Sequence, residues 1–142
     1  MKSDGDLRRL FRFYLPQIHW VTVETGATEP GVPDLNGCFQ RKEFWIENKF
    51  TAGWAMNFRP EQIGWISRRT RCGGHVFIAV RRRCDASTRR IAADELYIYS
   101  GVDILLLAER GLKNVDPLAL YREGPKRWAW DRVLGVIIGK IT

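Results

Sequence analysis

Apolar residues recur every three or four positions near the start of the chain, and this spacing predicts an amphipathic helix. Ser3 or Asp4 can cap its first turn, and Pro16 ends it. A second helix is predicted from Pro60 to about Arg71, because proline favours a first helical turn and two glycines follow the last turn. The core positions of the first helix are Leu7, Leu10, Phe11, Tyr14 and Leu15.

Short runs of apolar and β-branched residues predict the strands, which are expected at residues 19–24, 32–39, 44–50, 75–80 and 96–99. Residues 40–43 resemble a hairpin connection between the second and third of these strands. Two more helices are expected at residues 102–112 and 128–141. This order of elements predicts a mixed α/β fold.

Length and composition favour one intracellular domain. A chain of 142 residues has the commonest single-domain size, so we expect a single domain covering residues 1–142. No apolar run approaches the roughly 18 residues that a membrane span needs. Charged residues interrupt the first fifteen positions, which argues against a secretion signal and predicts a cytoplasmic protein. Three cysteines without CxxC spacing argue against a disulfide framework and a zinc site.

The charge balance favours an anionic partner. The net charge is +7, and 17 of the 23 basic residues are arginines, whose planar guanidinium groups fit phosphate oxygens in pairs. A solvated basic surface is the alternative explanation. Clusters also occur at residues 8–12 and 89–90, but the arginines expected to contact DNA are Arg68, Arg69, Arg71, Arg81, Arg82 and Arg83.

The predicted hairpin brings candidate catalytic groups together. If Arg41 and Lys42 are the two turn residues, Asp34 pairs directly with Lys49, and Glu47 lies on the same face two residues away. Two carboxylates offer oxygen ligands for Mg²⁺ or Mn²⁺, and an ammonium group can orient or deprotonate a water that attacks phosphorus. A cross-strand salt bridge on a solvated face is the alternative.

Two segments resemble the signature of the PD-(D/E)xK nucleases. They are GVPDL at residues 31–35 and FWIENK at residues 44–49. The following RPEQ at residues 59–62, with Trp65, is similar to the P-x-Q-x-x-W helix of VRR-NUC-type and phage-encoded members. The resemblance covers residues 19–83, the motif-bearing core, and leaves a C-terminal helical part at about residues 102–142.

The resemblance implies a restriction-endonuclease-like mixed sheet flanked by helices and Mg²⁺-dependent hydrolysis of DNA. Asp34 and Glu47 would be the metal ligands, Lys49 the catalytic lysine, and Gln62 a residue that supports the site. The alternative for Gln62 is an ordinary cap in the first helical turn. An upstream acid is also expected among the metal ligands. Glu24 matches its position, with Glu29, Asp4 and Asp6 as competitors.

The small members of this family include Holliday junction resolvases, so the resemblance implies a homodimer that cuts four-way DNA junctions, in a phage or mobile-element setting. A nickase, a flap or single-strand endonuclease, and a non-catalytic DNA-binding protein remain alternatives. Of the six tryptophans, Trp54, Trp128 and Trp130 lie near basic residues and could stack on unpaired bases, although core or interface positions are the alternative.

Overall fold

The computed structural model describes residues 4–24 and 29–141. Within these ranges, six strands form one mixed sheet in the order β1-β2-β3-β4-β5-β6, with β3 and β4 parallel and the other neighbours antiparallel. The strands are β1 (His19–Thr22), β2 (Leu35–Phe39), β3 (Lys42–Thr51), β4 (Val76–Cys84), β5 (Ala93–Ser100) and β6 (Ala119–Tyr121). The helices are α1 (Asp4–Tyr14), α2 (Pro60–Arg71), α3 (Ile104–Arg110) and α4 (Trp130–Gly139), with 3-10 turns η1 (Gly101–Asp103) and η2 (Leu112–Asn114).

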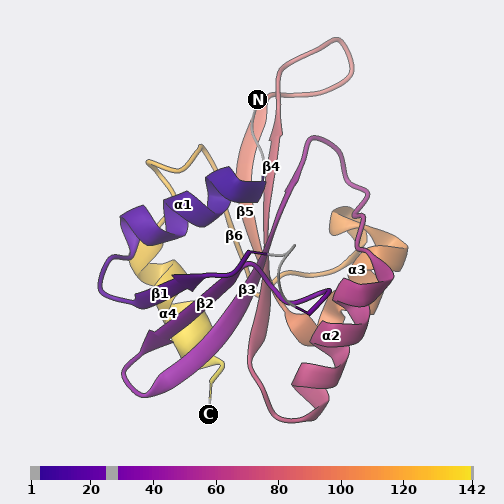
Figure 1. The fold of residues 1–142 in the computed structure, drawn as a ribbon. Coiled ribbons are helices and arrows are strands. Elements are labelled where there is room, and N and C mark those ends of the chain that lie inside the picture. The colour runs from indigo at the N-terminus through magenta and orange to yellow at the C-terminus, as the bar shows by residue number, and fades with distance from the viewer. Residues whose placement is uncertain (1–3, 25–28, 142) are drawn as a thin grey trace.

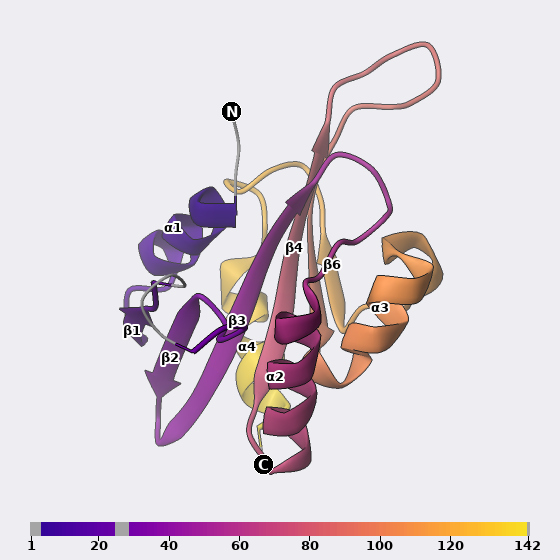
Figure 2. The same ribbon diagram turned by 45° about the vertical axis from the view of Figure 1, so that its right-hand side comes forward.

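Helices cover both faces of the sheet, as Figure 1 and Figure 2 show. On the face of α1 and α4, Phe11 packs edge-on against Trp130 at 5.5 Å between ring centroids. On the face of α2 and α3, Ile66 and Leu107 pack against Tyr99 from the sheet. The predicted mixed α/β sheet flanked by helices is therefore confirmed. Among helices in the described ranges, none combines the length and apolar character needed to cross a membrane.

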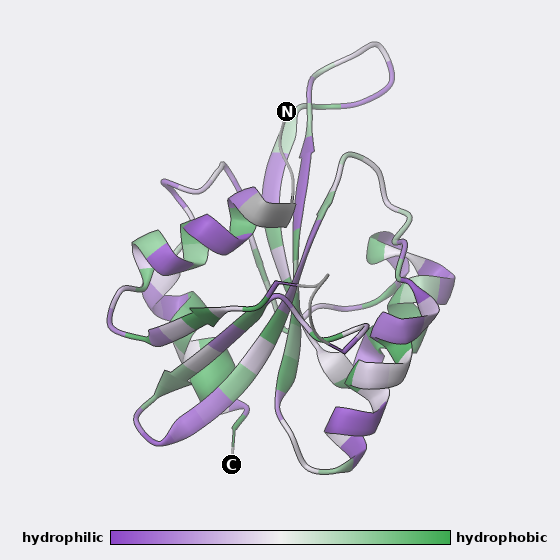
Figure 3. Ribbon diagram, in the orientation of Figure 1, coloured by the Kyte–Doolittle hydropathy of each residue, from purple (hydrophilic) through white to green (hydrophobic). Residues whose placement is uncertain are grey.

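The first half of β4 is apolar on both sides because it runs through the centre of the sheet. Its residues 76–80 are all buried, in agreement with the continuous apolar run predicted for a strand between two helical layers. Figure 3 shows the same concentration of hydrophobic residues in the middle of the sheet. The crossover from β3 through α2 to β4 is what allows these two strands to run parallel.

The turn between β2 and β3 differs from the prediction by one residue. Phe39 pairs with Lys42, so the turn residues are Gln40 and Arg41, and not Arg41 and Lys42. Both turn residues have positive φ, at 50° and 66°, which matches the backbone twist that two-residue hairpins need. The prediction was wrong because sequence composition does not show which polar residues will adopt this conformation.

Other element boundaries also differ from the prediction. Ser3, one of two predicted caps of α1, lies outside the described residues. β1 ends two residues earlier than predicted, and β4 extends four residues further, into the arginine cluster. The predicted helix at residues 102–112 is divided into η1 and α3, and Gly111 with φ of 77° ends it. The short strand β6 carries no alternating pattern and was missed.

Candidate functional site

Asp34 lies immediately before β2, one residue beyond the last pair of the β2–β3 ladder. The observed register therefore places it beside Glu47, and the predicted pairing with Lys49 is wrong. Its Oδ1 accepts hydrogen bonds from Asn48 N at 3.3 Å and Asn48 Nδ2 at 3.0 Å. Its Oδ2 is 3.6 Å from Arg8 Nη1 on α1. The carboxylate thus accepts a hydrogen bond from the backbone N–H of Asn48 at the point where the backbone pairing of β2 with β3 ends.

The environment of Asp34 disfavours its charge. Burial raises the pKa of Asp34 from 3.8 to about 6, although the two hydrogen bonds from Asn48 and the positive charge of Arg8 act in the opposite direction. Above that pH the site holds a buried carboxylate whose charge is only partly compensated. A cation bound beside it would offset this cost.

A glycine turn fixes the backbone of Asp34 against α2. Gly31 has a φ of 88°, and a Cβ at this position would overlap the carbonyl oxygen of Glu61 in the first turn of α2. Only glycine can make this close contact with α2, because it has no Cβ and tolerates a positive φ. The backbone carbonyl of Asp34 accepts a hydrogen bond from Val23 N at 2.9 Å. The GVPD segment is thereby held between β1 and the helix that carries Gln62.

Gln62 joins the two functional side chains of β3. Its Nε2 donates to Glu47 Oε2 at 3.2 Å, and its Oε1 accepts from Lys49 Nζ at 3.1 Å. Glu47 and Gln62 are buried, and Lys49 is half-buried with its Nζ 5.2 Å from the centroid of the Phe58 ring. The amide therefore holds a carboxylate and an ammonium group in one fixed array.

Gln62 also caps the helix on which it lies. Pro60 occupies the first helical position, and Gln62 Oε1 accepts from Arg59 N at 2.9 Å, as the third residue of a capping box does. The two interpretations of Gln62 from the sequence, site support and helix cap, are therefore compatible. Gln62 Oε1 accepts hydrogen bonds from both Arg59 N, at the start of the helix, and Lys49 Nζ.

The alternation of side chains along β3 determines which face of the sheet each functional group occupies. Glu47 and Lys49 share the face of β3 that meets α2, as their spacing of two predicts. Asn48 lies between them in the strand, so its side chain points to the opposite face, where it is fully buried. Its Oδ1 is a buried oxygen without a hydrogen-bond partner among the described residues. A buried oxygen without a hydrogen bond costs about 1 to 3 kcal/mol of desolvation free energy.

The predicted third carboxylate does not complete this site. Glu24 lies just after β1 and is exposed, and no group of three or more His, Cys, Asp or Glu side chains in residues 4–24 and 29–141 could hold a metal ion. The competitor Asp6 is 3.0 Å from Arg9, Glu29 is exposed, and the side chain of Asp4 lies outside the described part. The expectation that Glu24 joins Asp34 and Glu47 is therefore not met.

The remaining donor set fits Mg²⁺. This ion prefers oxygen ligands and is usually held by one or two carboxylates together with water and substrate phosphates. Asp34 and Glu47 provide two such carboxylates at adjacent positions of neighbouring strand segments. Burial raises the pKa of Asp34, so a positive charge beside its carboxylate would offset the cost of ionising it. Two carboxylate ligands of this kind suit either Mg²⁺ or Mn²⁺.

The structure separates the six arginines that were expected to contact DNA. Arg81 and Arg82 are buried and form ion pairs with Asp94 at 2.7 Å and Glu95 at 3.0 Å, so the prediction that they contact DNA as exposed cations is wrong. These pairs allow β4 to continue through charged residues. The remaining four arginines expected to contact DNA are exposed, namely Arg68, Arg69 and Arg71 in the last turns of α2 and Arg83 on β4.

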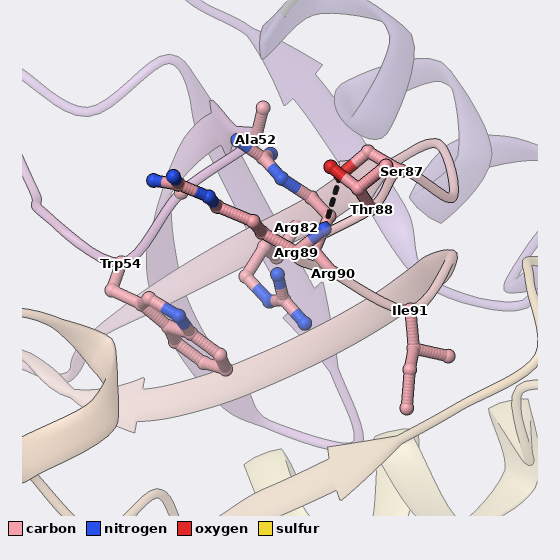
Figure 4. Close-up of a pocket in the computed structure, with 9 residues that line it drawn as sticks. Ala52, Trp54, Arg82, Ser87, Thr88, Arg89, Arg90 and Ile91 are labelled. Atoms are coloured by element: carbon pink, nitrogen blue, oxygen red, sulfur yellow. Dashed lines mark hydrogen bonds between the residues drawn. The ribbon is translucent and has the colours of Figure 1, made fainter.

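Sequence reasoning missed the support that α1 gives to the site and a basic cleft at one end of the sheet. Arg8 and Asn48 contact Asp34, but no local pattern marks them. Trp54 was one of three candidate stacking tryptophans. It is 41% exposed, whereas Trp128 and Trp130 are buried. Figure 4 shows that Trp54 lines the cleft together with arginines from the β4–β5 connection.

The fold and these side chains define a mixed α/β protein with a buried carboxylate–amide–lysine array on one face of its sheet. No protein-family model matches the sequence, and no curated protein matches it either. Among solved structures, the chain is similar to Hjc, a Holliday junction resolvase from the archaeal hyperthermophile Archaeoglobus fulgidus. The two are 11% identical with a TM-score of 0.43, over 68% of this chain and 74% of that chain.

Proposed function

We propose that this chain is a Mg²⁺-dependent endonuclease that hydrolyses phosphodiester bonds in DNA. The observation that carries the proposal is the Gln62 amide, which bonds Glu47 and Lys49 at once beside the buried carboxylate of Asp34. A salt bridge on a solvated sheet face needs no such arrangement. A protein that only binds DNA would also gain nothing from two buried acids, because keeping a buried carboxylate ionised costs free energy.

Asp34 and Glu47 are the proposed metal ligands. When bound to them, Mg²⁺ would polarise a phosphate oxygen and lower the pKa of a coordinated water. Asn48 holds Asp34 Oδ1 through two hydrogen bonds, and Gln62 holds Glu47 Oε2. Both carboxylates are thus oriented before substrate arrives, which lowers the cost of assembling the site.

Lys49 is the proposed catalytic lysine. Its Nζ donates to Gln62 Oε1, and the remaining N–H groups can bond the attacking water and a phosphate oxygen. As the water oxygen bonds to phosphorus, the ester P–O bond breaks, the water loses a proton and the leaving oxygen gains one. The ammonium charge offsets the negative charge that grows on the phosphate oxygens.

Branched DNA, with the four-way junction as its main form, is the proposed substrate. The net charge of +7 supports binding to a polyanion at a branch, where several backbones converge. Resolution of a junction needs two cuts on opposed strands, and therefore two copies of the chain. Nicked or flap DNA is the second candidate substrate, favoured by the exposed Trp54 cleft at the end of the catalytic face.

The proposal is tested by cleavage of labelled four-way junction, nicked, flap and linear duplex DNA with Mg²⁺. Paired symmetrical cuts in the junction, lost in both Asp34→Asn and Lys49→Ala, are the expected result. Cleavage of flaps alone would keep the nuclease and discard junction resolution. A wild-type protein that binds these DNAs in chelator and cuts none of them after Mg²⁺ is added would contradict the proposal.

A further inference from the structure

A cleft of about 760 Å³ lies beyond the carboxyl ends of β3 and β4. One wall is the loop at residues 52–54, and the other is the arm at residues 85–92, which projects beyond the sheet in Figure 1. Trp54 and three arginines line it, and no acidic residue from the described ranges does so. Its volume is within the range of sites that hold small ligands.

The cleft continues the face that carries the proposed catalytic groups. In the parallel pairing of β3 and β4, Lys49 is level with Val80, and Thr51 is level with Arg82. Because alternate residues of a strand share a face, Glu47, Lys49 and Arg82 lie on the same side of the sheet. Arg82 is one row beyond Lys49, which corresponds to about 7 Å along the strands. A DNA strand cut at Lys49 would therefore reach the cleft.

Several polar contacts hold the floor of the cleft. The Arg82 guanidinium lies 3.9 Å from the centroid of the Trp54 ring, and Arg82 Nε donates to Glu95 at 3.0 Å. Tyr97 donates to the same Glu95 oxygen at 2.9 Å. Leu112 N donates to the carbonyl oxygen of Trp54 at 2.8 Å. The partly exposed indole is thus held in place before any ligand arrives.

The arm contributes exposed positive charge to the cleft. Arg89 and Arg90 are exposed near its tip and extend toward the loop of Trp54 in Figure 4. The isolated bridge between Ser87 and Arg90 closes the tip, and Ser87 Oγ accepts from Arg89 N at 3.3 Å. Cationic groups therefore face an aromatic ring across an open space.

We propose that this cleft binds an unpaired nucleotide of the DNA strand next to the cut, with its base against Trp54 and its phosphates against Arg89 and Arg90. An aromatic ring beside free cations is the arrangement that binds single strands, because bases in a duplex already stack on each other. The inference rests on the proposed nuclease function and specifies its substrate. That substrate is branched DNA with unpaired nucleotides adjacent to the scissile bond.

The first test is binding of a fluorescent single-stranded oligonucleotide and of its duplex, measured by anisotropy in chelator. Trp54→Ala is expected to weaken single-strand binding about tenfold and to change duplex binding less than twofold. Trp54→Phe should restore most of the loss, because it keeps an aromatic face. Equal loss for both DNAs, or no loss for the single strand, would overturn the inference.

The charge contribution is tested with the double variant Arg89→Ala/Arg90→Ala. The matched control is Arg127→Ala/Arg132→Ala, which removes two exposed arginines in and before α4, the helix on the opposite face of the sheet. Only the first variant should weaken single-strand binding strongly and flatten its dependence on salt. Equal effects of both variants would show that net charge alone is responsible. Circular dichroism melts verify that every variant folds.

Cleavage separates this inference from the proposed function. Wild type should cut a four-way junction with unpaired nucleotides at the branch faster than a fully paired one, and Trp54→Ala should remove that difference. If wild type cuts DNA and Trp54→Ala keeps the difference, the inference fails while the nuclease stands. If wild type cuts nothing yet Trp54 controls single-strand binding, the nuclease proposal fails while the cleft assignment stands.

Discussion

At the residue scale, the pKa of Asp34 predicts how stability depends on pH. The folded-state pKa of about 6 lies above the ordinary 3.8, so folding favours the protonated form. The resulting stabilisation is complete below the ordinary pKa and is lost as the pH rises through about 6. Without divalent metal, Asp34→Asn should therefore be more stable than wild type at pH 8, by about 2 to 3 kcal/mol. The advantage should shrink towards pH 4.

Thermal or urea unfolding across this pH range measures the effect. Asp94→Asn is the matched control, because Asp94 forms a two-bond ion pair with the buried Arg81. Removing that partner leaves an uncompensated charge and should destabilise the protein at pH 8. An Asp34→Asn protein that is less stable than wild type at pH 8 in chelator would contradict the assignment of a costly buried charge.

Gln62 is predicted to position Glu47 and Lys49 as well as to cap α2. Gln62→Glu keeps an oxygen for Arg59 N and Lys49, but replaces the N–H donor to Glu47 with a second carboxylate at about the same place. Two neighbouring carboxylates resist ionising together, so the pH–rate profile of cleavage should move to higher pH while thermal stability changes little. A residue that only caps the helix would leave the profile unchanged.

At the element scale, the contact between the GVPD turn and α2 is predicted to be essential. Gly31→Ala places a Cβ against the backbone of Glu61 at positive φ and should destabilise the protein by at least about 2 kcal/mol. Gly64→Ala is the matched control, since Gly64 lies in α2 with open space around it. That change should stabilise the helix by about 0.5 to 1 kcal/mol. Chemical denaturation of both variants is the measurement, and equal effects would contradict the predicted contact.

The sequence predicted the elements that depend on local signals. Pro60 and the glycines after α2 gave its bounds correctly, and the spacing of Glu47 and Lys49 gave their shared face. The hairpin turn was misplaced because positive φ at Gln40 and Arg41 is not visible in residue type. β4 was cut short for a different reason. Two of its arginines, Arg81 and Arg82, are buried in ion pairs with acids of β5, across a long-range pairing.

In the candidate site, too, features set by local sequence were predicted and features set by long-range packing were not. Asp34, Glu47, Lys49 and Gln62 were all named from sequence, because a motif records spacing along the chain. Their actual bonds could not be predicted, since Asp34 contacts Arg8 through packing of α1 on the sheet. Glu24 was expected nearby on sequence position alone, and the structure does not gather it into a carboxylate cluster.

At the scale of the whole molecule, the proposed homodimer predicts a measurable interface. Val102, Leu105 and Leu106 on η1 and α3 are exposed apolar residues at helical spacing, and they offer a surface to a second copy. Sedimentation analysis should give a dimer for wild type and a monomer for Leu105→Glu. Phe13→Glu, which changes an exposed apolar residue of α1, should remain dimeric. A monomeric wild type at micromolar concentration would contradict the homodimer.

Asp34, Glu47 and Lys49 are proposed to form a metal-dependent nuclease site. The most direct measurement is the rate of cleavage of one labelled branched DNA with Mg²⁺ and with chelator, for wild type and for Glu47→Gln. The proposed site predicts cleavage by wild type with Mg²⁺ only, and a loss of at least about a hundredfold in the variant, which keeps the side-chain shape but loses a charged ligand. Equal cleavage by Glu47→Gln and wild type would contradict it.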